Sequence, residues 1–485
     1  MYFVVKIPLE VSDYNYKKLN SRLEVARVYY NAILAECLKR RRAYRESPEF
    51  SKAREIYKKS DKTTKSLADE LCDSARSAAG YYLRSAKQYN KDNSVEQYGY
   101  REIRKKGTWI AEHLDSHVCL NLTKRAFEAV KRHPKVYFKR YGRDYITSVE
   151  GKNLASSLTF RGKVVKWLGL NITAVIDHED AKHKFIIDHP DKISFVRLSR
   201  TLVRNKWHYY AELVCEGTPA VKPNHTLGKG KIGVDVGLSK VDYFNESSIK
   251  GTINLAKKVD FKQKQVRKLM RKLDRQRRAN NPNNFDEKGR AKKGCKNWVV
   301  SNREHETITE LRELKRQEKA FRHNLHGQVA NLLRSLGDDL YIEKCEYDKW
   351  QQNKKTRKCF GRKWKMSRSV TKRAPGLLVN LLRNKFLYTN GTINDIDTYK
   401  TKLTQTCPQC GNQKKKQLHE REHKCENCGL VGARDYFSAL LAICVNPDTS
   451  EINFEEARNY LSREMPTLAD EVDGGVTCDR TPTGV

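Results

Sequence analysis

Hydrophobic and polar residues alternate at the start of the chain, in FVVKIPLEV (residues 3–11), and this period of two predicts a β-strand. The period then changes. Hydrophobic residues recur at spacings of three and four, the stripe of an amphipathic helix, at Leu23, Ala26, Tyr30, Ile33 and Cys37. Helical character continues to about Arg132, so the first strand precedes a largely helical segment.

Alternation returns between Thr147 and Gly217 and predicts a β module. In NKWHYYAELVCEG (205–217), Trp207, Tyr209, Ala211, Leu213 and Cys215 fall on one face of a strand, and polar residues such as Lys206 and Glu212 fall on the other. The stretch from Gly217 to Gly230 has the glycine and proline content of a linker. We therefore expect a domain boundary there.

The second half of the chain alternates strands with helices. A strand (KIGVDVGL, 231–238) and a hairpin-like stretch precede two helices between Lys262 and Arg322, broken by NPNNFDEKGRAKKG (281–294). A strand in DDLYIEKCEY (338–347), a basic run, a helix in APGLLVNLLRNKF (374–386) and a strand in TINDID (392–397) follow. A cysteine-containing segment and a helix headed by Asp435 complete the series, so we expect an α/β domain.

The charge of the chain points to an anionic partner. The sequence contains 96 Lys and Arg against 58 Asp and Glu, a formal net charge of +38. Between Lys262 and Arg322 the net charge is +12, and between Lys354 and Arg373 there is no acidic residue. A polyphosphate neutralises many cations at once by releasing its counterions, so nucleic acid is the expected partner. We see no signal peptide and no apolar run of ~18 residues, and expect a cytoplasmic, nucleoid-associated protein.

Four of the thirteen cysteines form two pairs, Cys407 with Cys410 and Cys425 with Cys428, separated by fourteen residues. Two C-x-x-C knuckles at this spacing can offer four thiolates to one Zn²⁺ ion. A redox pair and unligated cysteines are the alternatives. His419 and His423 lie between the knuckles, and we interpret both as solvated because four cysteines already complete a structural site.

Three acidic residues in different elements are candidates for a second metal site. Strand alternation places Asp235 on one face between Gly233 and Gly237, leaving room for a hydrated cation and a phosphate near the backbone. Glu343 and Glu346 point to opposite faces if their strand is regular. Asp435 shares a helix face with Ala439 and Ala442, which allow close packing on a sheet. Carboxylates favour Mg²⁺, and two such ions can activate water against a phosphodiester.

The ordered combination of GVDVGL, a basic helical hairpin, YIEKCE, TKLTQTCPQCG and CENCGLVGARDYFSA resembles the TnpB family of transposon-encoded nucleases, relatives of compact type V CRISPR effectors. The resemblance covers about residues 231–445. It implies an RNase H-like (RuvC) nuclease domain over residues 231–406, with the basic hairpin at 262–322 inside it. A zinc ribbon at 407–430 and a last RuvC helix at 431–447 follow.

The N-terminal half resembles the family more loosely. There the resemblance implies a β-barrel-like wedge module at 1–16 and 147–220, interrupted by a helical recognition insertion at 17–146. Residues 448–485 carry more acidic than basic residues, and we expect a mobile acidic tail.

The resemblance also implies roles. Asp235, Glu343 and Asp435 match the catalytic acids that hold magnesium, with two ions expected, and Arg434 matches the arginine that precedes the third acid. A guide RNA then selects the target DNA, which a single RuvC site cuts. Glu343 is followed by Lys-Cys-Glu where the family commonly has Asp-Leu or Asn-Leu, which makes Glu346 a possible substitute. Phe437-Ser438-Ala439 replaces an Asn-Ala-Ala run.

The basic segments supply the candidate contacts to nucleic acid: Lys268, Arg271, Arg275, Arg278, Lys355, Arg362, Lys365 and Arg373. Tyr29, Tyr30 and Tyr44 are candidates for stacking on bases, with a core position the preferred interpretation for Tyr30. Two alternatives to a guided nuclease stay open, a guided DNA-binding protein that does not cut and a DDE-type transposase.

Overall fold

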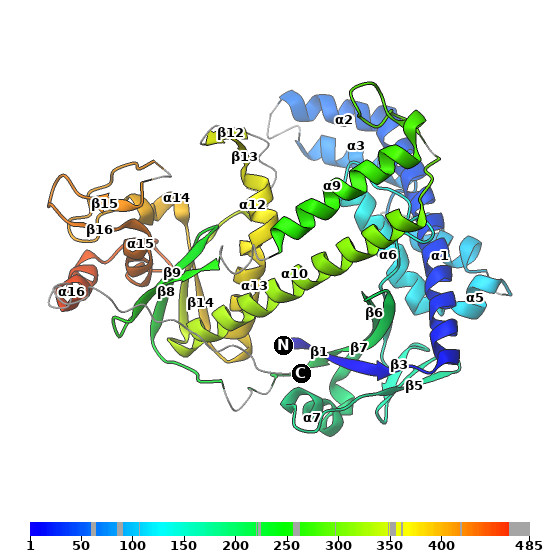
Figure 1. Cartoon of the computed structure of the whole chain (residues 1–485), viewed down its shortest axis with the longest axis horizontal. Coiled ribbons are helices and arrows are strands. Elements are labelled where there is room, and N and C mark those ends of the chain that lie inside the picture. The colour runs from blue at the N-terminus through cyan, green and yellow to red at the C-terminus, as the bar shows by residue number, and fades with distance from the viewer. Residues whose placement is uncertain are drawn as a thin grey trace. The chain divides into compact units, whose positions relative to one another are not determined.

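The computed structural model describes residues 1–59, 65–84, 91–105, 107–219, 221, 225–255, 262–295, 297–347, 349, 356–359, 362–417 and 420–464. The chain divides into two compact units, Met1–Ala220 and Val221–Val485 (Figure 1). The division falls inside the predicted linker. Within the described ranges, every helix is too short or too polar to cross a lipid bilayer.

The first unit is built on a seven-stranded sheet with the order β2-β6-β7-β1-β5-β4-β3 in the described residues. Its strands are β1 (Tyr2–Glu10), β2 (Ser148–Lys152), β3 (Thr159–Arg161), β4 (Val164–Trp167), β5 (Leu170–Ala174), β6 (Ile193–Val203) and β7 (Lys206–Glu216). Every neighbouring pair is antiparallel where the pairing is described. The predicted alternation is confirmed in β1, which buries Phe3, Val5, Ile7 and Leu9, and in β7, which buries Tyr209, Ala211, Leu213 and Cys215.

Helices fill the sequence between β1 and β2. They are α1 (Asp13–Glu46), α2 (Pro48–Lys59), α3 (Lys65–Ala78), α4 (Val95–Tyr98), α5 (Trp109–His113) and α6 (Ser116–Arg132), with a π-helical turn η2 at Gly99–Ile103. Helix α1 buries the predicted stripe. The core position preferred for Tyr30 is confirmed. Tyr29 and Tyr44 are buried as well, so the expectation that these two rings stack on bases is wrong. A further helix, α7 (Ala181–Asp188), precedes β6.

The second unit contains a five-stranded sheet in the order β10-β9-β8-β11-β14. Strands β8 (Lys231–Val236), β9 (Lys240–Asn245) and β10 (Lys250–Asn254) form an antiparallel meander. Strands β11 (Asp339–Glu343) and β14 (Thr392–Ile396) run parallel to β8. This mixed sheet, with helices between its parallel strands, confirms the predicted α/β class.

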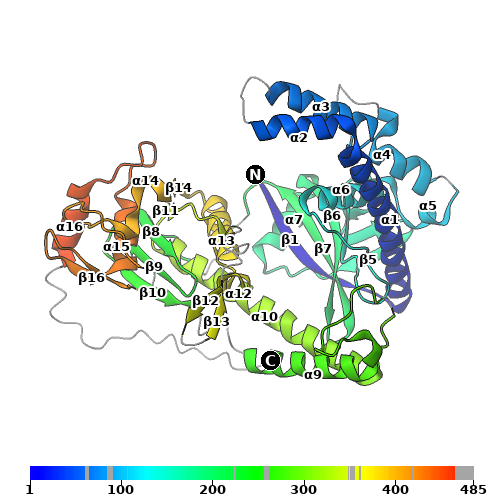
Figure 2. The same cartoon turned by 90° about the horizontal axis from the view of Figure 1, so that it is seen from above.

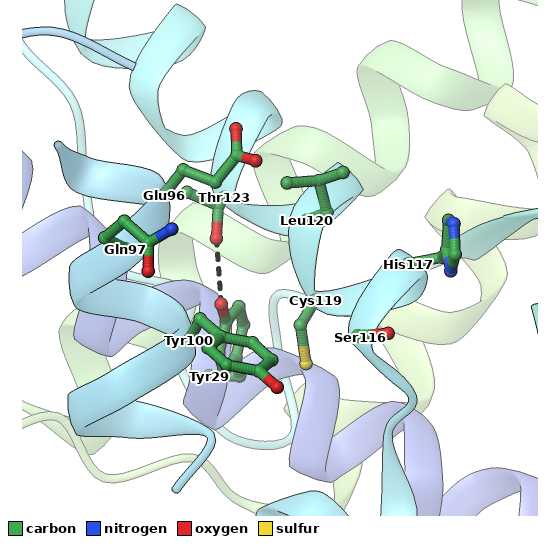
Figure 3. A pocket seen from close by; sticks show the side chains of 9 residues that line it. All are labelled: Tyr29, Glu96, Gln97, Tyr100, Ser116, His117, Cys119, Leu120 and Thr123. Atoms are coloured by element: carbon green, nitrogen blue, oxygen red, sulfur yellow. Dashed lines mark hydrogen bonds between the residues drawn. The ribbon is translucent and has the colours of Figure 1, made fainter. Parts of the chain in front are cut away.

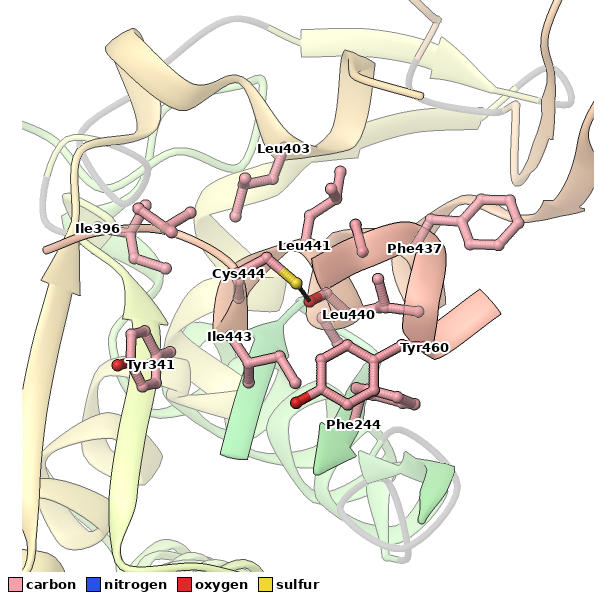
Figure 4. Close-up of a cluster of buried hydrophobic side chains, with 14 of the residues drawn as sticks. Phe244, Tyr341, Ile396, Leu403, Phe437, Leu440, Leu441, Ile443, Cys444 and Tyr460 are labelled. Atoms are coloured by element: carbon pink, nitrogen blue, oxygen red, sulfur yellow. Dashed lines mark hydrogen bonds between the residues drawn. The ribbon is translucent and has the colours of Figure 1, made fainter. Parts of the chain in front are cut away.

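Helices cover both faces of this sheet (Figure 2). On one face, Ile232, Val234 and Ile342 pack with residues of α10 (Asn302–Ser335) and α13 (Pro375–Tyr388). On the other, Tyr341 and Phe244 pack with α15 (Arg434–Ile443) and α16 (Phe454–Glu464), as Figure 4 shows. The face that carries Gly233 and Asp235 is therefore the one that α15 covers.

The basic hairpin consists of α9 (Gln263–Asn280) and α10, which pack through Val266, Leu269, Leu273 and Leu311. Helix α10 continues to Ser335, beyond the predicted end of the hairpin at 322, because Leu325, Val329 and Leu333 pack on the sheet. After β11 come β12 (Thr356–Cys359), β13 (Arg362–Lys365) and α12 (Met366–Arg373). Short elements α14 (Thr398–Thr401) and η5 (Leu403–Gln405) lead into the cysteine segment.

The expectation of a mobile tail from residue 448 is wrong for the part that the structure describes. Helix α16 buries Ala457, Tyr460 and Leu461 in the same core as α15. The sequence prediction relied on the net charge of residues 448–485, and a net charge does not reveal the apolar stripe of α16. Residues 465–485 lie outside the described residues.

Candidate functional site

Strand register brings acidic residues from β8, β9 and β11 into one row. Asp235 on β8 lies directly opposite Asp242 on β9. On the other side, Val234 pairs with Ile342 of β11, and Glu343 follows Ile342 at the end of that strand. Neighbouring residues across a sheet point to the same face, so Asp235, Asp242 and Glu343 share the face covered by α15.

Helix α15 approaches this face at Gly233. A Cβ atom added to Gly233 would lie 2.0 Å from the carbonyl oxygen of Ala439. The expectation that Gly233 leaves room for a cation and a phosphate is therefore wrong, because the backbone of α15 fills that space. The expectation that Ala439 allows close packing is confirmed, and this packing holds Asp435, at the start of α15, near the row of acids.

Asp435 is bound by three cations. Arg434 donates from Nε (2.9 Å) and Nη2 (2.8 Å) to Oδ1 of Asp435. Oδ2 accepts from Nη1 of Arg421 at 3.0 Å and from Nζ of Lys240 at 3.1 Å. Burial alone would raise the pKa of Asp435, but its bonds to Arg434 and Lys240 lower that pKa below the ordinary value. Asp435 is thus held as a carboxylate.

Asp235 and Glu343 have no such partners among the described residues. Burial, and next the charges of Glu343, Asp435 and Asp242, raise the pKa of Asp235 well above its ordinary value. Burial raises the pKa of Glu343 to about 7. Because the charge of Glu343 raises the pKa of Asp235, the two carboxylates lie close together, and a cation between them would be favourable. Only the four cysteines form a group of three or more metal-binding side chains within 4.8 Å in the part described.

Sequence reasoning missed three members of this site, Asp242, Lys240 and Arg421. Asp242 is buried and accepts from Nζ of Lys240 (3.0 Å) and from the hydroxyl of Thr252. Its signal was the hairpin, because the short turn at residues 237–239 sets the register that places Asp242 opposite Asp235. Arg421 had no local signal. It meets Asp435 because the backbone N–H of Arg434 bonds the carbonyl of Arg421 at the base of the cysteine segment.

Glu346 lies apart from the row of acids. Strand β11 ends at Glu343, and Glu346 is half exposed, with its carboxylate bound to Lys349 at 2.5 Å. Asp235 and Glu343 therefore share the sheet face that carries Asp435 on α15, and Glu346 lies beyond the end of β11.

The four cysteines converge as their spacing predicts. Sγ atoms of Cys407 and Cys428 lie 3.6 Å apart, and those of Cys410 and Cys425 lie 3.5 Å apart. Four thiolates around one Zn²⁺ ion at ~2.3 Å would be separated by roughly 3.8 Å, so the cluster fits this ion. Gly411 and Gly429 both adopt a φ of +73°, which closes the two knuckles.

The cysteine segment leads directly into α15. Strands β15 (Glu422–Lys424) and β16 (Val431–Ala433) form its hairpin, and Arg434 begins the helix at the next residue. Arg434 also donates from Nη1 to the carbonyl of Glu420 at 2.7 Å. The cysteine cluster and the third acid therefore share one rigid connection.

His423 is buried, so its interpretation as solvated is wrong. It packs edge-on against Phe437, and Lys416 contacts its Nδ1. Burial, assisted by the charge of Lys416, lowers the pKa of His423 to about 4, which keeps the ring neutral. His419 lies outside the described residues.

The residues predicted to contact nucleic acid lie in different parts of the second unit. Lys268, Arg271 and Arg275 line a cavity of about 440 Å³ on α9, together with Lys264 and Arg267. Arg278 pairs with Asp274 at 2.9 Å, and Arg373 donates to Ser239 at 3.0 Å. Arg362 and Lys365 belong to β13, and Lys355 lies outside the described residues.

Another cavity, of about 260 Å³, lies in the first unit (Figure 3). Its lining comes from α1, α4, η2 and α6 and includes Tyr29, Gln97 and Tyr100. The hydroxyl of Tyr29 bonds that of Thr123 at 2.8 Å, as the dashed line marks. A Cβ at Gly99 would meet that same Tyr29 hydroxyl at 2.6 Å, so glycine permits this packing.

Comparison with known families matches residues 376–441 to the TNB domain of the Cas12f1-like family. The matched segment spans α13, β14, the cysteine cluster and most of α15. This segment is similar to a Cas12f1-like TNB domain. The match confirms, over these residues, the resemblance to the TnpB family and the compact type V effectors. None of the curated proteins compared with the chain matches it.

Three solved structures resemble the model over long stretches. A Cas12f1–sgRNA–target DNA complex has 11% identity and a TM-score of 0.39, covering 90% of this chain and 98% of its own. A CRISPR-Cas12f ternary complex has 14% identity and a TM-score of 0.28, with coverages of 92% and 87%. The mini-RNA-guided endonuclease CRISPR-Cas_phi3 has 12% identity and a TM-score of 0.30, with coverages of 61% and 57%. With values this low, the family resemblance rests on the TNB segment and the sequence motifs.

Proposed function

We propose that the chain is an RNA-guided DNA endonuclease that hydrolyses phosphodiester bonds at a magnesium-dependent, RuvC-like site. The observation that carries this proposal is that Asp235 and Glu343 share the sheet face covered by α15, whose Asp435 lies near enough for its charge to raise the pKa of Asp235. The meander β10-β9-β8, followed by two parallel strands, is the arrangement expected of an RNase H-like domain. The Cas12f1-like TNB segment lies where such a domain would carry its zinc ribbon.

The donor set fits magnesium. Asp235 and Glu343 are carboxylates without a hydrogen-bond or ion-pair partner among the described residues. Burial raises the pKa of both, and the charge of Glu343 further raises that of Asp235. Oxygen donors of this kind suit Mg²⁺, and we assign two ions to Asp235, Glu343 and Asp435. When bound, such ions activate water and stabilise the charge on a leaving oxygen.

The remaining side chains prepare the site for that chemistry. Arg434 orients Asp435 through two bonds to one oxygen and is itself fixed to the carbonyl of Glu420. Arg421 lies at the edge of the site, with its side chain 63% exposed, where it can exchange Asp435 for a phosphate. The four cysteines would hold one structural Zn²⁺, which fixes the ribbon and with it the start of α15.

Guide RNA and target DNA are the proposed partners. The Cas12f1 structure that resembles the chain is a complex with both. The cationic lining on α9 supports the same partners, because a group of lysine and arginine side chains on one helix face suits a phosphate backbone. Specificity would come from base pairing, so the protein needs mainly to hold backbones.

Asp235→Asn tests the nuclease proposal. The chain is purified with its copurifying RNA, the RNA is sequenced to find the guide, and binding and scission of matching DNA are measured. We expect equal binding and lost scission in the variant. Unaltered scission would overturn the assignment of Asp235. Binding without scission by the unchanged chain would favour a guided DNA-binding protein, and RNA-independent joining of transposon ends would favour a transposase.

A further inference from the structure

Lys240 stands where a cation of the proposed metal site would otherwise bind Asp435. Its Nζ atom lies 3.0 Å from Oδ2 of Asp242 and 3.1 Å from Oδ2 of Asp435. One ammonium group thus bridges two carboxylates that belong to different elements, β9 and α15. Both carboxylates are buried, with side chains that are 5% and 8% exposed.

The two carboxylates that Lys240 binds differ in their other partners. Asp435 has Arg434 and Arg421 as further partners, whereas Asp242 has the hydroxyl of Thr252 and no second cation among the described residues. If Lys240 leaves Asp435, it can stay on Asp242, which neighbours it on the same strand. The turn that carries Lys240 is fixed as well, since the N–H of Gly237 donates to the carbonyl of Lys240 at 3.0 Å.

The remaining acids of the row lack this compensation. Asp235 and Glu343 are free of ion pairs in the described part of the chain, while Asp435 is saturated by cations. A metal ion entering between Asp235 and Glu343 can therefore recruit Asp435 only if a cation releases Oδ2. Lys240 and Arg421 are the two groups on that oxygen.

We propose that Lys240 is the resident counterion of Asp435 and Asp242, and that it competes with a divalent cation for Asp435. When the metal ion binds Asp435, the ammonium group of Lys240 leaves that carboxylate. It then remains bound to Asp242 alone, beside the metal site. Lys240 is a positioning residue that sets how much metal the site needs. This inference rests on the proposed function, because it requires that the acids bind a divalent ion.

Binding of Mn²⁺ to the zinc-loaded chain, followed by calorimetry and by the electron paramagnetic resonance of free Mn²⁺, tests the proposal. Lys240→Met should tighten Mn²⁺ binding about tenfold, since an opposite charge at this range typically shifts a carboxylate equilibrium by roughly one to three pKa units. Lys231→Met is the matched control. Lys231 lies on β8 and pairs with Glu456 at 2.9 Å, away from the row of acids, and its loss should leave the affinity within twofold.

A double substitution separates competition at Asp435 from a general effect of charge. With Asp435→Asn as the background, Lys240→Met should change Mn²⁺ affinity less than twofold, because the contested carboxylate is gone. An equal tightening in both backgrounds, or no tightening in either, would overturn the proposal. Lys240→Gln is the substitute if circular dichroism finds Lys240→Met unfolded.

Asp235→Asn distinguishes the failure of this inference from the failure of the proposed function. If Asp235→Asn leaves Mn²⁺ binding unchanged, the acids do not form the metal site, and the proposed function fails with it. If Asp235→Asn weakens binding but Lys240→Met has no effect, the metal site stands and only the competition by Lys240 is refuted.

Discussion

Gly233 of β8 lies so close to Ala439 of α15 that a Cβ atom on Gly233 would be 2.0 Å from the Ala439 carbonyl oxygen. This contact sets the height of the helix above the sheet. The position of Asp435 above Asp235 therefore depends on the absence of a side chain at Gly233.

Gly233→Ala should destabilise the second unit by ~1–3 kcal/mol, because the clash is with backbone and no flexible side chain can move aside. Gly327→Ala on α10 is the matched control. A Cβ there meets nothing within 4 Å, and alanine favours a helix by ~1 kcal/mol over glycine. Denaturant unfolding measures both variants, and equal stability of the two would contradict the close contact.

Glu343→Gln should reduce DNA scission by more than about 100-fold. Even the loss of a residue that only hydrogen-bonds a metal ligand typically lowers activity or metal affinity by about 10–100-fold, and Glu343 is proposed as a ligand itself. Glu346→Gln should remain within twofold of the unchanged chain, because Glu346 is half exposed and paired with Lys349. Guided cleavage of one DNA substrate compares them. The reverse order of effects would make Glu346 the second acid.

The stability of the metal-free site should fall as the pH rises. Glu343 has a folded pKa of about 7 against an ordinary 4.5, so the folded state binds its proton more tightly. The contribution of Glu343 to the free energy of unfolding is therefore fully present below pH 4.5 and is lost as the pH rises through about 7. This contribution is up to ~3 kcal/mol. Unfolding at pH 5 and pH 7.5 without added Mg²⁺ measures it.

Glu343→Gln provides the comparison for this pH effect. His326 and His423 have pKa values lowered to about 4 and change stability in the opposite sense as the pH falls below 6.5. Their contribution is common to both chains. The difference in unfolding free energy between Glu343→Gln and the unchanged chain should therefore shrink as the pH falls. A difference that stays constant with pH would exclude a raised pKa at Glu343.

Cys407→Ala should abolish zinc binding and weaken scission, because the cysteine segment that carries Arg421 also leads directly into α15. Elemental analysis gives the zinc content, and hydrogen exchange of residues 405–435 reports the loosened ribbon. Cys295→Ser, outside the cluster, should keep its zinc. Retained zinc in Cys407→Ala would argue against a four-cysteine site.

Neutralising Lys264, Lys268 and Arg271 together with glutamine should weaken nucleic-acid binding and lower the slope of log affinity against log salt by about three. These side chains line one face of α9. Binding titrations at several salt concentrations give the slope. An unchanged slope would place the phosphate contacts elsewhere.

Local patterns predicted most of the elements, and long-range contacts decided the rest. Alternation placed Asp235 on the strand face of Gly233 and Gly237, and the cysteine spacing predicted the cysteine cluster, since both patterns reflect neighbours in the chain. That Asp235 and Glu343 share a face follows from the register of β8 on β11, which local patterns do not give. The space at Gly233 was misjudged because glycine admits a helix as readily as a ligand. Arg421 could not be found, since its partner Asp435 is reached only through the β15–β16 hairpin.

The order of the acids along the chain has a consequence for biosynthesis. Asp235 and Glu343 are both made before α15, and the sheet face that they share stays bare until that helix leaves the ribosome. A nascent chain that ends in β14 therefore has the two repelling carboxylates but neither Asp435 nor the arginines that accompany it. The centre is therefore complete only once α15 has been made and has packed on the sheet.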